Sequence, residues 1–122
     1  MEIYNYESLG NIFYLSSFKR ELSKLKKDNP NYAKWLDRKI KILSQDAAGA
    51  TDGIHFEKLS SQQLYSIRRP SKNNERVIYY IITDDNSVIL LTAFAEHNDS
   101  DYQRSIERAN QRLKILKEEF LK

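Results

Sequence analysis

The spacing of hydrophobic residues changes from a helical to a strand-like period near the middle of the chain. In the first half, Phe18, Leu22 and Leu25 recur at helical spacing, which predicts one helix. A second helix is predicted to start at Pro30, which suits a first helical position, and its apolar stripe runs through residues 32–43. Because only a short polar segment separates the two helices, we expect them to pack as an antiparallel hairpin.

The second half of the chain alternates with the period of a β-strand. Four strands separated by polar turns are predicted over residues 55–59, 64–69, 75–83 and 87–95. The third is apolar on both faces, which is typical of a strand in the middle of a sheet. A final helix with an apolar stripe over residues 102–120 follows, and Ser100 and Gln103 match the pattern of a capping box at its start.

The first six residues, MEIYNY, alternate enough to predict a short N-terminal strand. The expected order is therefore a strand, a helical hairpin, an antiparallel sheet and a C-terminal helix, which defines an α+β fold. The 122 residues suffice for a single domain over residues 1–122, but they are too few for two separate hydrophobic cores.

The amino-acid composition argues against several classes of protein. The chain has no cysteine, which excludes a disulfide framework and a thiolate metal site. No apolar run approaches the ~20 residues that are needed to cross a bilayer. The N-terminal residues do not show the basic start and apolar run of a signal peptide, so we expect none. Only three Gly and two Pro argue against disorder. We therefore expect a folded cytoplasmic protein that does not contact membranes.

Charge is distributed unevenly, although the net charge is only +3. From Lys19 to Lys41 there are nine basic and three acidic residues, whereas residues 81–101 carry five acids and no Lys or Arg. Lys34, Arg38 and Lys41 lie off the apolar stripe of the second helix. Such a surface can attract a polyanion or an acidic protein, and the alternative is that it is the solvated face of two helices.

Two of the predicted strands carry arginine within apolar sequence. Residues two apart on a strand share a face, so Arg68 lies with Ser66, and Arg76 lies with Tyr80. One pairing register places Lys58, Arg68, Arg76 and Tyr80 on a common face, although the sequence does not fix the register. Arginine matches two phosphate oxygens and tyrosine can stack on an unpaired base, so this face suits single-stranded RNA. The alternative is that these arginines are solvated.

Cleavage of RNA at such a face needs a base for the 2′-hydroxyl proton and an acid for the leaving 5′-oxygen. Histidine is the most direct choice, because its ordinary pKa of about 6.5 lies close to neutral pH. This chemistry needs no metal, and the two histidines have no third ligand at a recognisable metal-binding spacing. The candidate groups for proton transfer are His97, Glu57, Glu96, Lys58 and His55.

Four segments in the second half of the chain form a recognisable series, namely FEKLSSQQLYSIRRP, ERVIYYI, VILLTAFAEH and DYQRSIERANQRL. Together they resemble the RelE/ParE superfamily of bacterial toxins, and within it the HigB-like branch. The match spans residues 55–113, and the predicted order of elements extends the resemblance over nearly the whole chain.

The resemblance implies a microbial-RNase-like fold and an mRNA interferase that forms a 2′,3′-cyclic phosphate without metal or other cofactor, usually on the ribosome. It implies that Arg68 and Arg76 bind phosphate, that Lys58 is a basic residue of the cleft and that His97 transfers a proton. The partner of His97 in that role would be Glu57 or Lys58. Implied binding partners are mRNA, the ribosome and a cognate antitoxin of the helix-turn-helix, HigA-like kind.

The chain departs from the family pattern at two places. Glu96 and His97 stand where many relatives have two lysines, and Ser66 stands where a glutamate is common. The ParE branch shares the fold but inhibits DNA gyrase by binding and lacks the cationic cleft. Arg68, Arg76 and His97 together speak against that branch, but this non-enzymatic alternative stays open. A third alternative is an RNA-binding accessory protein that does not cleave.

Overall fold

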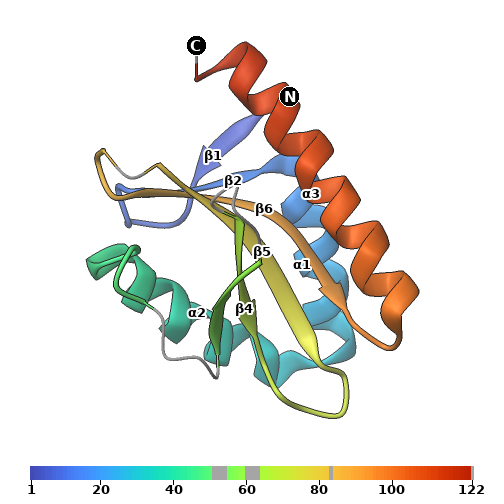
Figure 1. Cartoon of the computed structure of the whole chain (residues 1–122). Coiled ribbons are helices and arrows are strands. Elements are labelled where there is room, and N and C mark those ends of the chain that lie inside the picture. The colour runs from blue at the N-terminus through green and yellow to red at the C-terminus, as the bar shows by residue number, and fades with distance from the viewer. Residues whose placement is uncertain (51–54, 60–63, 83, 122) are drawn as a thin grey trace.

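The computed structural model describes the chain except for residues 51–54, 60–63, 83 and 122. The described residues form an α+β fold with a six-stranded sheet and three helices (Figure 1). In chain order the elements are β1 (Ile3–Asn5), β2 (Ile12–Leu15), α1 (Ser16–Asp28), α2 (Pro30–Gln45), β3 (Phe56–Lys58), β4 (Leu64–Arg68), β5 (Glu75–Ile82), β6 (Ser87–Ala95) and α3 (Asp99–Glu119).

The predicted antiparallel pairing of the four later strands is confirmed, but the sheet as a whole is mixed, because β2 adds a parallel pair. The strand order is β1-β2-β6-β5-β4-β3, and all neighbouring strands are antiparallel except β2 and β6. The sequence pattern does not predict β2, because its four residues, IFYL, do not alternate and run directly into α1. Its parallel pairing with residues 88–90 of β6 is a tertiary contact that local periodicity cannot show.

The predicted strands are confirmed: the last one has its predicted bounds, and the first three of them are shorter than predicted. The N-terminal strand is β1, and the four later strands are β3 to β6. β5 lies between β4 and β6, as its two apolar faces predict. The predicted turn at residues 60–63 lies outside the described residues.

Helices cover both faces of the sheet. The ring of Tyr102 in α3 lies 4.7 Å from the guanidinium of Arg76 on one face. On the other face, the Lys39 ammonium of α2 lies 6.0 Å from the ring of Phe56. Figure 1 shows α2 and α3 on opposite sides of the sheet, and α1 beside β6. The helices α1 and α2 pack against each other and are separated only by Asn29.

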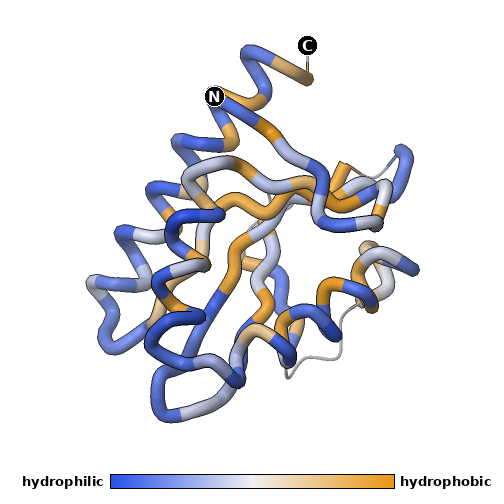
Figure 2. Tube along the Cα trace, turned by 180° about the vertical axis from the view of Figure 1, so that it is seen from behind, coloured by the Kyte–Doolittle hydropathy of each residue, from blue (hydrophilic) through white to orange (hydrophobic). Residues whose placement is uncertain are grey.

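The hydrophobic core lies between the sheet and these helices. Figure 2 shows that the central strands are the most hydrophobic part of the chain and that hydrophilic residues dominate the outer helix surfaces. Burying a large apolar side chain contributes about 1.5–3 kcal/mol, so these residues supply much of the stability. The largest fully buried side chains include Phe18, Tyr32, Leu36, Ile40, Ile67 and Tyr79. None of the described helices is long and apolar enough to cross a lipid bilayer.

The third helix begins differently from its prediction. Asn98 is the N-cap residue, and its side chain accepts a hydrogen bond from the Asp101 backbone N–H at 2.9 Å. The Asp101 carboxylate accepts one from the His97 N–H at 3.1 Å. The predicted capping box of Ser100 and Gln103 is therefore wrong, because the N-cap is Asn98, two residues earlier, and its side chain accepts from the Asp101 N–H. This turn fixes the chain just after β6.

The carboxylate of Glu21 links α1 to β6 and α3. The register between β5 and β6 shifts at Ile78 and Tyr79, which leaves Leu91 as the extra residue of a β-bulge. The Leu91 carbonyl accepts a hydrogen bond from Arg112 of α3 at 2.8 Å. Arg112 also donates to Glu21 of α1 at 2.7 Å. The backbone carbonyl at the bulge is therefore satisfied by a side chain of α3, which α1 in turn holds in place.

Candidate functional site

Arg68 and Arg76 are direct neighbours across β4 and β5, as their register places one opposite the other. Both side chains therefore project from the same face, as in the pairing register that the sequence allowed but did not fix. The Arg76 side chain is only 4% exposed, whereas Arg68 is half-buried. Because like charges directly opposite each other destabilise a sheet, this pair needs negative charge close by.

Two carboxylates from different strands supply that charge. Arg76 Nη2 lies 3.2 Å from Glu96 Oε2, and Arg76 Nη1 lies 3.6 Å from Glu57 Oε1. The Glu57 and Glu96 side chains are 39% and 18% exposed, so solvent reaches both of them. Glu57, Arg68, Arg76 and Glu96 are called the arginine–carboxylate cluster below.

Backbone pairing determines where both carboxylates lie. Glu57 pairs with Ser66, whose hydroxyl accepts a hydrogen bond from Arg76 at 3.4 Å. Glu96 lies one residue beyond β6, but its N–H donates to the Asn74 carbonyl at 3.1 Å and continues the strand pairing. The Asn74 side chain donates to Glu96 Oε2 at 2.8 Å. Asn74 has a φ of 48°, a left-handed conformation that asparagine adopts more readily than most residues.

The third helix covers one side of the cluster. The Tyr102 ring lies 4.7 Å from the Arg76 guanidinium, which is cation–π geometry. The Nε–H groups of Arg68 and Arg76 are buried and have no hydrogen-bond partner among the described residues. A buried donor without an acceptor costs about 1–3 kcal/mol. Both groups are therefore donors without an acceptor in the described part of the chain, and each is closed to solvent in this conformation.

Lys58 is not part of the cluster, so the predicted common face of Lys58, Arg68 and Arg76 is wrong. In the observed register Lys58 pairs with Tyr65, and Tyr65 pairs with Tyr79. Lys58 therefore projects from the opposite face of the sheet, which α2 covers, while its neighbour Glu57 takes the position beside Arg76. One residue of register moves a side chain to the other face, and the sequence does not specify that register.

His97 also lies apart from the cluster. Phe94 pairs with Arg76, so strand alternation places Glu96 on the cluster's face and directs His97 away from it. The exposed His97 lines two pockets beside α1, of about 340 and 130 Å³, together with Leu25 and Asp28. Neither arginine of the cluster lines these pockets. The geometry favours Glu96 over His97 as the group next to Arg76.

His55 lies against α2 instead of the cluster. Its ring centroid is 5.6 Å from that of Trp35, and its Nδ1 lies 3.3 Å from the Lys39 ammonium. Across the residues that the structure describes, no group of three or more His, Asp or Glu side chains could hold a metal ion.

Tyr80 lies on the same face as Arg76 but under α3. The Lys117 ammonium lies 5.3 Å from its ring, and Tyr80 is half-buried. A base could stack on this ring only if Lys117 moved aside.

The predicted basic residues of α2 are exposed, but they lie on the side of the sheet opposite the cluster. Lys34 and Arg38 project into solvent, while Lys41 forms an ion pair with Asp37 at 2.9 Å. The hydrogen bond from Lys41, together with one from Tyr6, lowers the pKa of the Asp37 carboxyl. This basic stripe is therefore a surface separate from the cluster.

Sequence reasoning missed two residues that shape the cluster, namely Tyr102 and Asn74. Tyr102 belongs to the apolar stripe of a helix, which predicts packing and nothing more. Asn74 sits in a polar turn whose contacts become visible only with the β5–β6 pairing. A usable signal for Glu96 was that strand alternation could continue one residue past the apolar run.

No protein-family model matches the chain, and no curated protein is similar enough in sequence to count as a relative. The membership in the RelE/ParE superfamily stays a prediction from the motifs described above.

Proposed function

We propose that the chain is the toxin of a type II toxin–antitoxin pair and a metal-independent endoribonuclease that cleaves mRNA, most often on the ribosome. The observation that supports this proposal best is one arginine between two carboxylates, beside a second arginine on the same sheet face. Cleavage by the 2′-hydroxyl needs these groups: fixed cations for the charge that develops on phosphate, and two groups that transfer protons.

In the proposed reaction, Arg68 and Arg76 bind the non-bridging oxygens of the scissile phosphate. The Arg76–Glu57 contact, the longer of its two ion pairs at 3.6 Å, gives way to the phosphate. One of the two carboxylates takes the 2′-hydroxyl proton while the 2′-oxygen forms a bond to phosphorus. The bond from phosphorus to the 5′-oxygen breaks, and the other carboxyl, in its protonated form, gives that oxygen a proton. The products are a 2′,3′-cyclic phosphate and a 5′-hydroxyl.

In this assignment Glu96 takes the role that the sequence gives to His97, and Glu57 is its partner. Asn74 and Arg76 both bind one oxygen of Glu96, which fixes the direction of its other oxygen. No cofactor takes part. The partners are mRNA, the ribosome and a HigA-like antitoxin, and the site of action is the cytoplasm. Lys34, Arg38 and Lys41 would offer ribosomal RNA or an acidic antitoxin segment a second contact.

The chemistry of this proposal is tested with a message that carries a single 2′-deoxynucleotide at the position cleaved in the all-ribose message. In a ribosome-programmed translation mixture, the protein should cut the all-ribose message and leave a 2′,3′-cyclic phosphate, while the substituted message stays intact at that site. Cleavage of the substituted message at the same position would contradict attack by the 2′-hydroxyl.

The second candidate is a ParE-like toxin that inhibits DNA gyrase by binding. The near-complete burial of Arg76 favours it, because a buried ion pair can serve the fold alone. In that case growth arrest would persist in Glu57→Gln and Glu96→Gln, no new RNA ends would form, and the purified protein would inhibit gyrase-dependent supercoiling of plasmid DNA.

A further inference from the structure

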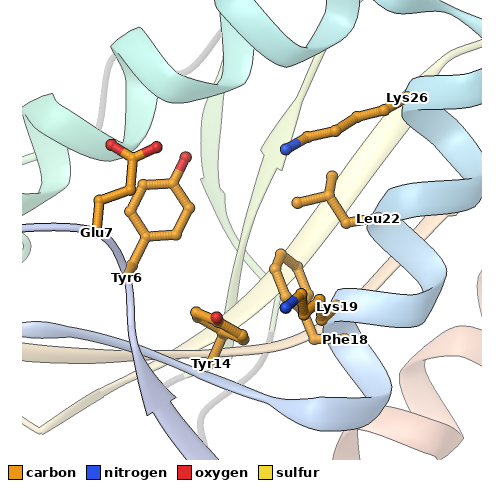
Figure 3. Close-up of a pocket in the computed structure, with 7 residues that line it drawn as sticks. All are labelled: Tyr6, Glu7, Tyr14, Phe18, Lys19, Leu22 and Lys26. Atoms are coloured by element: carbon orange, nitrogen blue, oxygen red, sulfur yellow. The ribbon is translucent and has the colours of Figure 1, made fainter.

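A separate pocket opens between α1, β2 and the β1–β2 connection, and it shares no residue with the arginine–carboxylate cluster. It has a volume of about 170 Å³ and is partly enclosed by the four side chains of Tyr6, Tyr14, Phe18 and Leu22 (Figure 3). A water molecule occupies roughly 30 Å³ of liquid, so the pocket has room for a group of several heavy atoms.

The apolar walls of this pocket are held in place by ring contacts. The ring centroids of Tyr6 and Tyr14 are 6.3 Å apart at an angle of 85°, and those of Tyr14 and Phe18 are 6.2 Å apart. Tyr6 and Phe18 are buried, and the Tyr6 hydroxyl already donates to Asp37 at 3.1 Å. The walls therefore present rigid apolar surface with no unused hydroxyl at Tyr6.

The rim of the pocket is charged and asymmetric. Lys19 and Lys26 project from α1, and Figure 3 shows the Lys26 side chain extending over the opening toward Tyr6. Both lysines are exposed, and neither has a carboxylate within 4.0 Å in the described part of the chain. Glu7 lies on the opposite rim, beside Tyr6.

The helix α1 as a whole also carries an excess of positive charge. The helix carries five basic and two acidic residues, and Glu21 is turned away into hydrogen bonds with β6 and α3. The open side of the pocket therefore faces an excess of lysine, which attracts a negatively charged partner.

We propose that this pocket binds one large apolar side chain, leucine or phenylalanine, of an acidic peptide segment in a partner protein. Acidic residues of that segment would lie against Lys19 and Lys26. At the opposite rim, a basic residue or backbone N–H groups of the same peptide would contact Glu7. A nucleotide fits less well, because the Tyr6 hydroxyl is engaged and Glu7 would repel a phosphate. This inference does not rest on nuclease activity.

The test uses a fluorescein-labelled synthetic peptide in which Leu-Phe is flanked on one side by glutamates and on the other by a lysine. Fluorescence polarisation should give a dissociation constant of about 10–100 µM, as expected for a single anchored contact. Replacing Leu-Phe by Ala-Ala should weaken binding about tenfold or more, because the anchor is lost.

A matched pair of charge variants on the same helix locates the binding site. Lys19→Glu with Lys26→Glu should weaken the peptide about tenfold or more, whereas Lys24→Glu with Lys27→Glu has the same change of charge away from the pocket and should have a much smaller effect. Amide shifts at Tyr14 and Leu22 on peptide addition report on the pocket directly. RNA cleavage by the first double variant should be unchanged, which separates this test from the proposed function.

Three results would overturn the inference. The first is equal binding of the Ala-Ala peptide or equal weakening by both double variants, which would indicate attraction by charge alone. The second is a single-stranded RNA oligonucleotide that shifts the Tyr14 and Leu22 amides at lower concentration than the peptide. The third is no saturable peptide binding up to about 1 mM, which is too weak for a specific contact.

Discussion

One oxygen of Glu96 accepts hydrogen bonds from both Arg76, at 3.2 Å, and Asn74, at 2.8 Å. Glu96 follows the end of β6, while Arg76 and Asn74 come from β5 and the turn before it. The carboxylate is thereby held at the sheet end beside the arginine pair. A surface glutamate would otherwise sample several rotamers.

Asn74→Gly tests whether this orientation of Glu96 matters. Glycine accepts the left-handed φ of 48° at this position without strain, so the change removes the side-chain hydrogen bond and little else. If the cluster is catalytic, the rate of RNA cleavage should fall by up to about 100-fold, with substrate binding little changed. Single-turnover kinetics measure this, and an unchanged cleavage rate would show that Glu96 needs no such support.

Arg76→Met tests the contribution of the buried cation to the fold. Arg76 is 4% exposed and bound to two carboxylates, so its removal leaves Glu57 and Glu96 without their cation and should cost about 1–3 kcal/mol of unfolding free energy. Arg104→Met is the matched control: that side chain is 66% exposed in a pair with Asp101, and its loss should cost at most about 0.5 kcal/mol. Urea denaturation measures both, and equal effects would contradict the structural burial of Arg76.

Glu21→Ala should be among the most destabilising single substitutions at a charged residue. The Glu21 carboxylate accepts hydrogen bonds from Thr92, Arg108 and Arg112, and Thr92 is fully buried. Its removal should lower the unfolding free energy by about 2–4 kcal/mol, because buried donors lose their acceptor. Glu107→Ala, an exposed position on α3, should change it by less than about 0.5 kcal/mol. A loss at Glu21 no larger than at Glu107 would be evidence against this junction.

The start of α3 should respond to acid. The hydrogen bond from the His97 backbone, helped by Arg104, lowers the pKa of Asp101 below its ordinary value of 3.8. A depressed pKa means that the cap contributes fully above the unfolded-state value and is lost as the pH falls through the folded value. The His97 amide resonance should therefore titrate with a midpoint below 3.8, and Asp101→Asn should abolish that transition. A midpoint at or above 3.8 would show that the contact is absent in solution.

Local sequence pattern predicts most of the fold. Helical spacing and strand alternation place α1, α2, α3 and β3 to β6, because each of these elements has one consistent period and clear turn residues at its ends. β2 has neither, since its four apolar residues merge into α1 and depend on β6 for their hydrogen bonds. Because β2 was not predicted, its parallel pairing with β6 was not expected either.

The candidate site was predictable only in part. Alternation predicts the neighbours of Arg68 and of Arg76 within each strand, but only the observed register places the two arginines opposite each other. The face on which Lys58 lies depended on the register of the three-residue strand β3. In the observed register Glu57, not Lys58, lies on the same face as Arg76. Whether Glu96 or His97 lies beside Arg76 depended on whether strand pairing continues past β6. It does continue, because the Glu96 N–H donates to the Asn74 carbonyl.

The most direct test of the central claim is inducible expression in bacteria with mapping of mRNA 5′ ends. The compared proteins are the wild type, Glu96→Gln, Arg76→Lys and His97→Ala. The account predicts growth arrest with new cuts inside messages for the wild type and His97→Ala. It predicts loss of both in Glu96→Gln and Arg76→Lys, with folded protein confirmed by circular dichroism. Wild-type arrest without new RNA ends, or cuts that persist in Glu96→Gln and disappear in His97→Ala, would contradict it.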